Sequence, residues 1–95
     1  MLTFSWDRHK AAANLRKHGV SFAEAQTVFF DECARLIADP DHSDDEDRFI
    51  ILGLSASLNL LIVCHCYREG ESGIRIISVR KAVRNEIENY RRHRK

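Results

Sequence analysis

The chain has 95 residues, with 15 basic and 14 acidic side chains, so its formal net charge is +1. This length predicts a single domain over residues 1–95 and excludes a two-domain protein. A composition of 44% hydrophobic and 31% charged residues excludes a disordered or a membrane-embedded chain. The small net charge taken alone argues against nucleic-acid binding, because domains of that class are usually clearly basic.

The charge is distributed unevenly along the chain. The net charge is +2 over residues 1–30, −7 over residues 31–47, +1 over residues 48–67 and +5 over residues 68–95. Within residues 31–47, six of the eight acidic residues fall in the segment DPDHSDDED at 39–47, whose composition is typical of a solvated loop. The chain is therefore basic apart from one acidic insert, and nucleic-acid binding stays open.

The N-terminal third predicts a short strand and two helices. A weak alternation at Leu2–Trp6 favours the strand, and Asp7 is a good N-cap for a first helix that ends at Gly19. Ser21 and Glu24 have capping-box spacing, in which each side chain bonds the backbone N–H of the other. A second helix is therefore expected at 22–30, and its apolar stripe consists of Phe22, Ala25, Val28 and Phe29.

The remaining chain predicts four strands and a last helix. The β-rich runs are Cys33–Ala38, Arg48–Leu54, Leu60–Tyr67 and Ile74–Val79. Short connections between the last three predict an antiparallel meander. Ser78 is a candidate cap for a helix from about Arg80 to Tyr90, with Val83, Ile87 and Tyr90 as its buried stripe. The fold class is α+β with a small antiparallel sheet, in the order β-α-α-β-β-β-β-α. The helices are expected to cover one sheet face, and something else part of the other.

Two short helices joined at a glycine turn also resemble a DNA-binding helix-turn-helix. The second helix, FAEAQTVFF, carries one acidic side chain and no Arg or Lys. Contacts to phosphates and bases are hard to build from such a helix. We therefore favour a helical hairpin that packs on the sheet.

A group of basic residues gathers around the last strand and the last helix. The group consists of Arg68, Arg75, Arg80 and Arg84, with Lys17 and His18 as further candidates. A guanidinium at the start of the last helix could bind phosphate together with the N–H groups of the first helical turn. The alternative is a solvated basic face or ion pairs with Glu86 and Glu88.

Acid–base chemistry has candidates of its own. His65 and Tyr67 fall on one face of a central strand, and the hairpin register cannot be read, so either Arg75 or Ile76 could lie beside His65. Cleavage of RNA requires one oxygen to lose a proton, another to gain one, and a charged phosphate to be stabilised. His, Glu, Lys, Tyr and Arg can share these tasks without a metal. The alternatives are a hydrogen-bonded structural role for His65 and a helix-terminal role for His18.

The cysteines point to a reducing compartment. Their number, three, suits no disulfide framework, so the cytoplasm is the expected location. In a strand, Cys64 and Cys66 face one side and His65 the other, so the three cannot easily share one metal ion. We expect no metal, no cofactor, no signal peptide and no membrane helix.

Three segments resemble the BrnT family of type II toxin–antitoxin toxins: FSWDRHKAAANLRKHGVSFAEAQTVFFD at 4–31, Arg48 with Gly53, and RIISVRKAVRNEIENY at 75–90. They occur in the same order as in the family and span nearly the whole chain. The family motif positions here are Trp6, Asp7, Lys10, Asn14, Lys17, His18, Gly19, Phe22, Arg48, Gly53, Arg75, Ser78, Arg80, Glu86 and Tyr90. Val79 departs from the small residue usual in the family, and the strand around His65 matches the family less well.

The resemblance implies a RelE-like fold and a ribonuclease that inhibits translation by cutting RNA. It also implies a cognate BrnA-like antitoxin with a ribbon-helix-helix part, which alone contacts operator DNA, and it leaves open a dimer or a heterotetramer with that antitoxin. No membrane partner is expected.

We therefore expect a metal-independent RNA endonuclease. The candidate catalytic residues are Arg75, Arg80, Lys17, His18, His65 and Glu86, and the candidate phosphate-binding residues are Arg68, Arg84 and Arg48. Tyr90 is expected to pack rather than to react. The alternative function is a non-enzymatic partner that binds an antitoxin or acts as a DNA corepressor.

Overall fold

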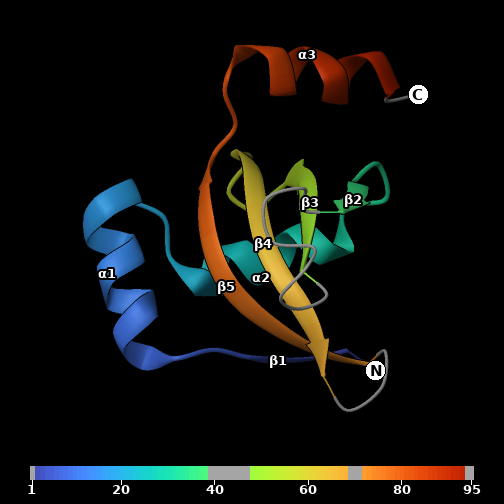
Figure 1. Ribbon diagram of the computed structural model, residues 1–95. Coiled ribbons are helices and arrows are strands. Elements are labelled where there is room, and N and C mark those ends of the chain that lie inside the picture. The colour runs from blue at the N-terminus through green and yellow to red at the C-terminus, as the bar shows by residue number, and fades with distance from the viewer. Residues whose placement is uncertain (1, 39–47, 69–71, 94–95) are drawn as a thin grey trace.

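The computed structural model describes residues 2–38, 48–68 and 72–93, and the predicted acidic loop at 39–47 lies outside them (Figure 1). The elements are β1 (Thr3–Ser5), α1 (Arg8–His18), α2 (Phe22–Thr27), the 3-10 turn η1 (Val28–Phe30), β2 (Arg35–Ala38), β3 (Arg48–Leu54), β4 (Leu60–Arg68), β5 (Gly73–Lys81) and α3 (Arg84–His93). This sequence of elements confirms the predicted order β-α-α-β-β-β-β-α.

All the described strands join one sheet in the order β1-β5-β4-β3-β2. The antiparallel meander β3-β4-β5 confirms the prediction, and β2 extends it antiparallel to β3. β1 instead pairs in parallel with the start of β5. The sheet is therefore mixed and not antiparallel throughout as predicted, because a strand from the far end of the chain returns to the β5 edge, which local patterning does not reveal.

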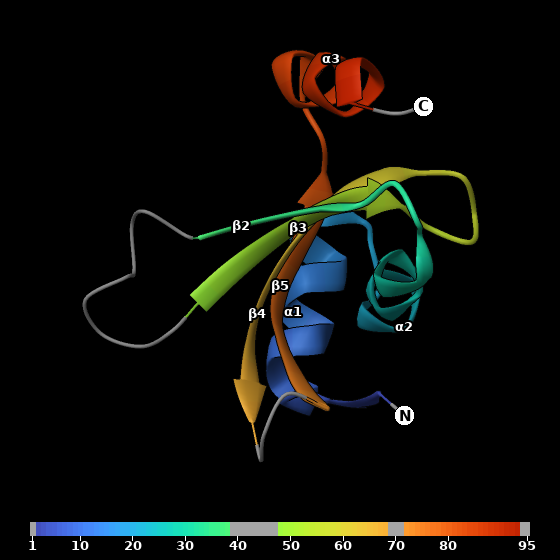
Figure 2. The same cartoon turned by 90° about the vertical axis from the view of Figure 1, so that its right-hand side faces the viewer.

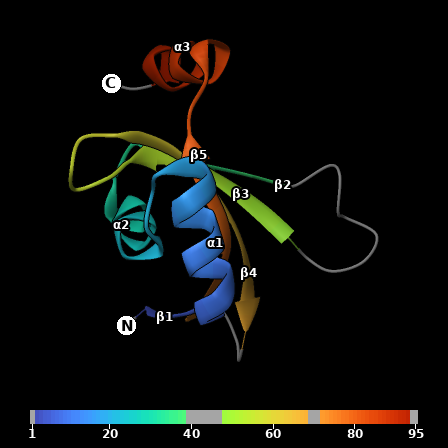
Figure 3. The same ribbon diagram turned by 90° about the vertical axis from the view of Figure 1, so that its left-hand side faces the viewer.

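Helices cover the two faces of the sheet unequally. In Figure 2 and Figure 3, α1 and α2 lie on one face and α3 lies on the other. The larger core cluster lies on the sheet face that α1 and α2 cover, here called the α1/α2 face. It packs α2 against the strands through residues such as Phe22, Leu61 and Ile76. The smaller cluster is built on Leu52, Ile62 and Tyr90 beneath α3. As predicted, one face is covered by the helical pair and the other in part by a different element.

The caps of α1 confirm the sequence prediction. The Asp7 carboxylate accepts hydrogen bonds from the N–H groups of His9 at 2.8 Å and Lys10 at 3.0 Å. Gly19 ends the helix in the left-handed region, with a φ of 71°. Asn14, which is buried, donates from Nδ2 to the carbonyls of Val20 and Val79 and accepts the Val79 N–H at Oδ1. Its amide therefore attaches α1 to β5.

The capping box of α2 forms only in part. Ser21 Oγ accepts the Glu24 N–H at 3.0 Å, as predicted. The Glu24 carboxylate instead accepts hydrogen bonds from Ser55 Oγ at 2.6 Å and Asn59 Nδ2 at 2.8 Å. These bonds lower the pKa of Glu24. The predicted return bond is therefore wrong, because the β3–β4 connection offers the carboxylate two side-chain donors.

The start of the last helix also differs from the prediction. Ser78 caps no helix, because β5 stays paired with β4 as far as Lys81, and Ser78 lies opposite Cys64. The helix begins at Arg84, where the Glu86 carboxylate accepts the Val83 N–H at 2.9 Å. Of the predicted stripe, Tyr90 is buried, Ile87 is half-buried, and Val83 is exposed.

Gly53 allows η1 to approach β3 closely. A Cβ atom at this position would lie 2.8 Å from Val28 Cγ1 and 3.0 Å from Ala34 Cβ. A side chain here would push these elements apart, so close packing explains the glycine.

Candidate nucleic-acid interface

A bulge in β5 places two predicted phosphate ligands on the same face of the sheet. Arg75 and Arg80 are five residues apart, and in a regular strand an odd separation puts side chains on opposite faces. The pairing with β4 shifts between Cys64 and His65, so that Ile77 is the extra residue in β5. Arg75 and Arg80 therefore both project on the α3 face, while Ile74, Ile76 and Val79 are buried on the other.

Register pairs across the meander arrange the α3 face in three rows. The rows are Arg48–Cys66–Arg75, Ile50–Cys64–Ser78 and Leu52–Ile62–Arg80. β2 adds Arg35 to the third row, opposite Leu52. The first and third rows are four residues apart along β4, or roughly 13 Å. The face thus carries arginines at both ends and apolar side chains and thiols between them.

Arg80 is held by an acidic side chain of α3. Its two terminal nitrogens each donate a 2.8 Å hydrogen bond to Glu86, one to each carboxylate oxygen. The bond to Arg80 lowers the pKa of Glu86, and the bond to Glu86 raises the pKa of Arg80. The ion pair with Glu86 that the sequence left as an alternative is therefore present, and it fixes the guanidinium at the junction of β5 and α3.

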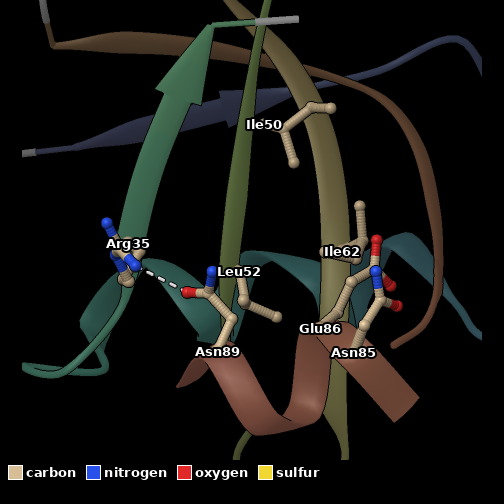
Figure 4. A pocket seen from close by; sticks show the side chains of 7 residues that line it. All are labelled: Arg35, Ile50, Leu52, Ile62, Asn85, Glu86 and Asn89. Carbon is tan, nitrogen blue, oxygen red and sulfur yellow. Dashed lines mark hydrogen bonds between the residues drawn. The ribbon is translucent and has the colours of Figure 1, made fainter. Parts of the chain in front are cut away.

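A cavity of about 180 Å³ lies between α3 and the sheet. Its lining residues are Arg35, Ile50, Leu52, Ile62, Asn85, Glu86 and Asn89, shown in Figure 4. Arg35 donates a 2.5 Å hydrogen bond to Asn89 Oδ1, which attaches β2 to α3. The cavity adjoins the Arg80–Glu86 pair, since Glu86 belongs to both.

His65 lies apart from these arginines. Its side chain is fully buried on the α1/α2 face, and its strand neighbour is Ile76 rather than Arg75. The ring packs edge-on against Phe29 at a centroid distance of 4.7 Å and against Tyr67 at 5.4 Å. Burial lowers the pKa of His65, so the neutral ring is favoured in the folded protein.

The other predicted residues divide between the faces. Lys17 and His18 lie in the last turn of α1, which packs on the face opposite α3. Arg48 and Arg68 project on the α3 face by strand alternation, and Arg84 is exposed at the first turn of α3. The structure thus brings Arg75, Arg80, Glu86 and Arg48 to one face and leaves Lys17, His18 and His65 on the other.

Sequence reasoning missed Arg35, Asn85 and Asn89. Arg35 occurs in the acidic segment, where it looked like a minor correction to the charge. Asn85, Glu86 and Asn89 have the i, i+1, i+4 spacing of one helix face, and this spacing was the available signal.

In the parts of the chain that the structure describes, no group of three or more His, Cys, Asp or Glu side chains is placed to hold a metal ion. Within the same residues, no helix has the length and apolar character needed to cross a membrane.

Comparisons with known proteins identify the family. A sequence model of the ribonuclease toxin BrnT of type II toxin–antitoxin systems matches residues 6–86. Among solved structures, the chain is similar to the crystal structure of the Brucella abortus ribonuclease toxin BrnT, with 23% identity, a TM-score of 0.67, and coverage of 88% of this chain and 100% of that chain. No curated protein matches the chain. A type II toxin acts with a cognate antitoxin, and a ribonuclease acts on RNA. Since the family match spans most of its length, the chain belongs to the BrnT ribonuclease toxins of type II toxin–antitoxin systems.

Proposed function

We propose that this chain is a metal-independent RNA endonuclease that inhibits translation, and that the α3 face of its sheet holds the RNA. The observation that carries the proposal is the β5 bulge, which puts Arg75 and Arg80 on one face beside Arg48. Guanidinium groups fixed before the reaction can stabilise the charge that develops on a phosphate under attack. A single RNA strand can reach both arginine rows because the side chains are long.

The proposed roles follow from position. Arg75 makes no hydrogen bond or ion pair with the described residues, so its guanidinium is available for a phosphate. Arg80 is the second phosphate ligand, and Glu86 acts by positioning its guanidinium. Arg48, Arg68 and Arg84 bind flanking phosphates. We assign His65 a packing role because its ring is enclosed by Phe29, Phe49 and Tyr67.

We further propose that a BrnA-like ribbon-helix-helix antitoxin neutralises the toxin in the cytoplasm and supplies the operator contact. Family membership supports this partner. We assign no DNA contact to the α1–α2 pair, because the buried side chains of α2, Phe22 and Ala25, pack it against the sheet.

Cleavage of a long RNA by the purified toxin tests the proposal. We expect cleavage with and without EDTA, and loss of cleavage by at least about tenfold in Arg75→Ala and Arg80→Ala, since single electrostatic contacts to a transition state are worth this much or more. Arg16→Ala is the matched control, because Arg16 is exposed on α1, away from the α3 face. Circular dichroism verifies that each variant is folded.

Three outcomes contradict the proposal. The folded protein does not cleave RNA at all, cleavage disappears in EDTA and returns with Mg²⁺, or cleavage survives both arginine substitutions.

A further inference from the structure

The cavity beneath α3 has a volume that suits one small ring. Its volume of about 180 Å³ is several times the roughly 30 Å³ share of a water molecule in the liquid. It is smaller than the roughly 300–1,000 Å³ pockets that enclose drug-sized ligands. A whole nucleotide therefore exceeds it, whereas a single base suits it.

The walls of the cavity differ in chemistry. The sheet contributes the aliphatic side chains of Ile50, Leu52 and Ile62, which form an apolar wall for the flat face of a ring. The helix contributes the amides of Asn85 and Asn89 and the carboxylate of Glu86, which form a polar wall for its edge. Proteins also hold unpaired bases in this way, with apolar side chains against the ring face and hydrogen bonds to its edge.

The amide of Asn89 is oriented in advance. A guanidinium can only donate hydrogen bonds, so the bond from Arg35 fixes Oδ1 of Asn89 toward β2. The Nδ2 donors then point to the other side, toward Leu52 and the cavity, as Figure 4 shows. The Glu86 carboxylate, deprotonated beside Arg80, offers acceptor oxygens on the same helix face.

We infer that this cavity is a nucleobase subsite, which holds one unpaired base of the RNA next to the phosphate bound by Arg80. The inference rests on the proposed function, because the same face holds the RNA backbone. It goes further in assigning base preference to Asn89, with Arg35 as the residue that positions its amide.

Titration of isotope-labelled protein with ribonucleoside 5′-monophosphates, followed by NMR, tests the subsite directly. We expect amide shifts at the cavity-lining residues of β3 and α3 with at least one nucleotide, and no such shifts with ribose 5-phosphate, which carries the phosphate but no base. Ile50→Phe should abolish the nucleotide-specific shifts, because the larger side chain fills the cavity from a half-buried position.

Cleavage mapping on an RNA of mixed sequence gives a second readout. We expect the wild-type protein to prefer one base beside the cut, and Asn89→Ala to reduce that preference by roughly fivefold or more, since one base-edge contact is worth at least this much. Arg35→Lys should weaken the preference less than Asn89→Ala. Glu88→Ala, an exposed neighbour on α3 outside the cavity lining, should leave the preference unchanged.

The outcomes separate the two proposals. Equal shifts with ribose 5-phosphate, or an unchanged base preference in Asn89→Ala while cleavage persists, overturn the subsite and leave the endonuclease standing. Base-specific shifts at the cavity in a protein that does not cleave RNA support the subsite and overturn the endonuclease.

Discussion

Ile77 shows how one residue changes what a strand presents to solvent. Without the extra residue, the alternation along β5 would bury either Arg75 or Arg80 among the apolar side chains under α1 and α2. With it, Ile76 and Val79 remain in the core while both arginines stay on the α3 face. Sequence reasoning grouped these arginines by their proximity along the chain. It had no means of placing them on one face, because the bulge depends on pairing with β4.

Asn14 offers a prediction at the same scale. Its amide makes three hydrogen bonds to the backbone of Val20 and Val79 in a buried position. Asn14→Ala should lower the free energy of unfolding by roughly 2–3 kcal/mol, because it leaves buried backbone groups unpaired. Urea denaturation measures the change. Asn85→Ala, an exposed asparagine, should change it by less than about 0.5 kcal/mol.

Leu58 is a site of backbone strain. It has a φ of 66° in the β3–β4 connection and a side chain that is 77% exposed. Left-handed backbone is costly for leucine and better tolerated by asparagine. Leu58→Asn should therefore raise the free energy of unfolding by about 0.5–1 kcal/mol, and Leu58→Ala, which keeps the strain, should not. An equal gain in both variants would show that removing the exposed apolar surface, and not relief of strain, is the cause.

At the scale of elements, polar contacts help to attach α3 to the sheet. Tyr90 donates a 2.7 Å hydrogen bond to Asp31 Oδ2, which also accepts the Leu54 N–H. Asp31 Oδ1 accepts the N–H of Cys33. This carboxylate therefore joins the end of η1, the end of β3 and the last helix.

Tyr90→Phe tests this attachment. Loss of a hydrogen bond to a charged group should destabilise the protein by roughly 1.5–3 kcal/mol. Hydrogen exchange should accelerate first in the α3 amides, since that helix loses its link to Asp31. Val83→Ala, at an exposed position beside α3, is the control. If the α3 amides of Tyr90→Phe keep their protection, the bond does not anchor the helix.

The elements differ in how far the sequence predicts them. The bounds of α1 followed from Asp7 and Gly19 because caps are local signals. The start of α3 did not, because the run after Ile74 fits strand or helix until its pairing with β4 is known. The cavity was out of reach for the same reason, since Arg35 and Asn89 meet only in the folded chain.

For the whole molecule, stability should fall in two stages as the pH is lowered. Burial lowers the pKa of His65 from 6.5, so below that pH the unfolded chain takes up a proton that the folded chain resists, and the free energy of unfolding decreases. Hydrogen bonds lower the pKa values of Glu24 and Glu86 from 4.5. Their stabilisation is complete above 4.5 and is lost as the pH falls through the folded-state values.

His65→Phe isolates the first stage. Phenylalanine fills a similar volume and does not titrate. In this variant, the free energy of unfolding measured by urea denaturation should therefore no longer fall between pH 7.5 and 5. His9→Gln is the matched control, because His9 is exposed on α1. If the free energy of unfolding of His65→Phe still falls over this pH range, other titrating groups are responsible.

RNA affinity should show how many arginines act together. Each phosphate neutralised on a single strand contributes a slope of about −0.7 to the dependence of log affinity on log salt. Arg75→Ala should therefore reduce the magnitude of the slope by about 0.7, and Arg16→Ala should leave it unchanged. Binding is measured by fluorescence anisotropy at 50–200 mM salt with a short RNA. A slope unaffected by Arg75→Ala would place the phosphates elsewhere.

The hydrogen bonds between Asn14 and Val79 also hinder strand pairing between two copies of the chain. β1 pairs with β5 only from Gly73 to Arg75, so the rest of that edge has no strand partner among the described residues. Exposed edges with free N–H and C=O groups invite another chain to add a strand, which is a common route to aggregation. At Val79 the amide of Asn14 hydrogen-bonds both the N–H and the C=O, as a neighbouring strand would. A side chain of α1 thus satisfies backbone groups of the β5 edge beyond the end of its pairing with β1.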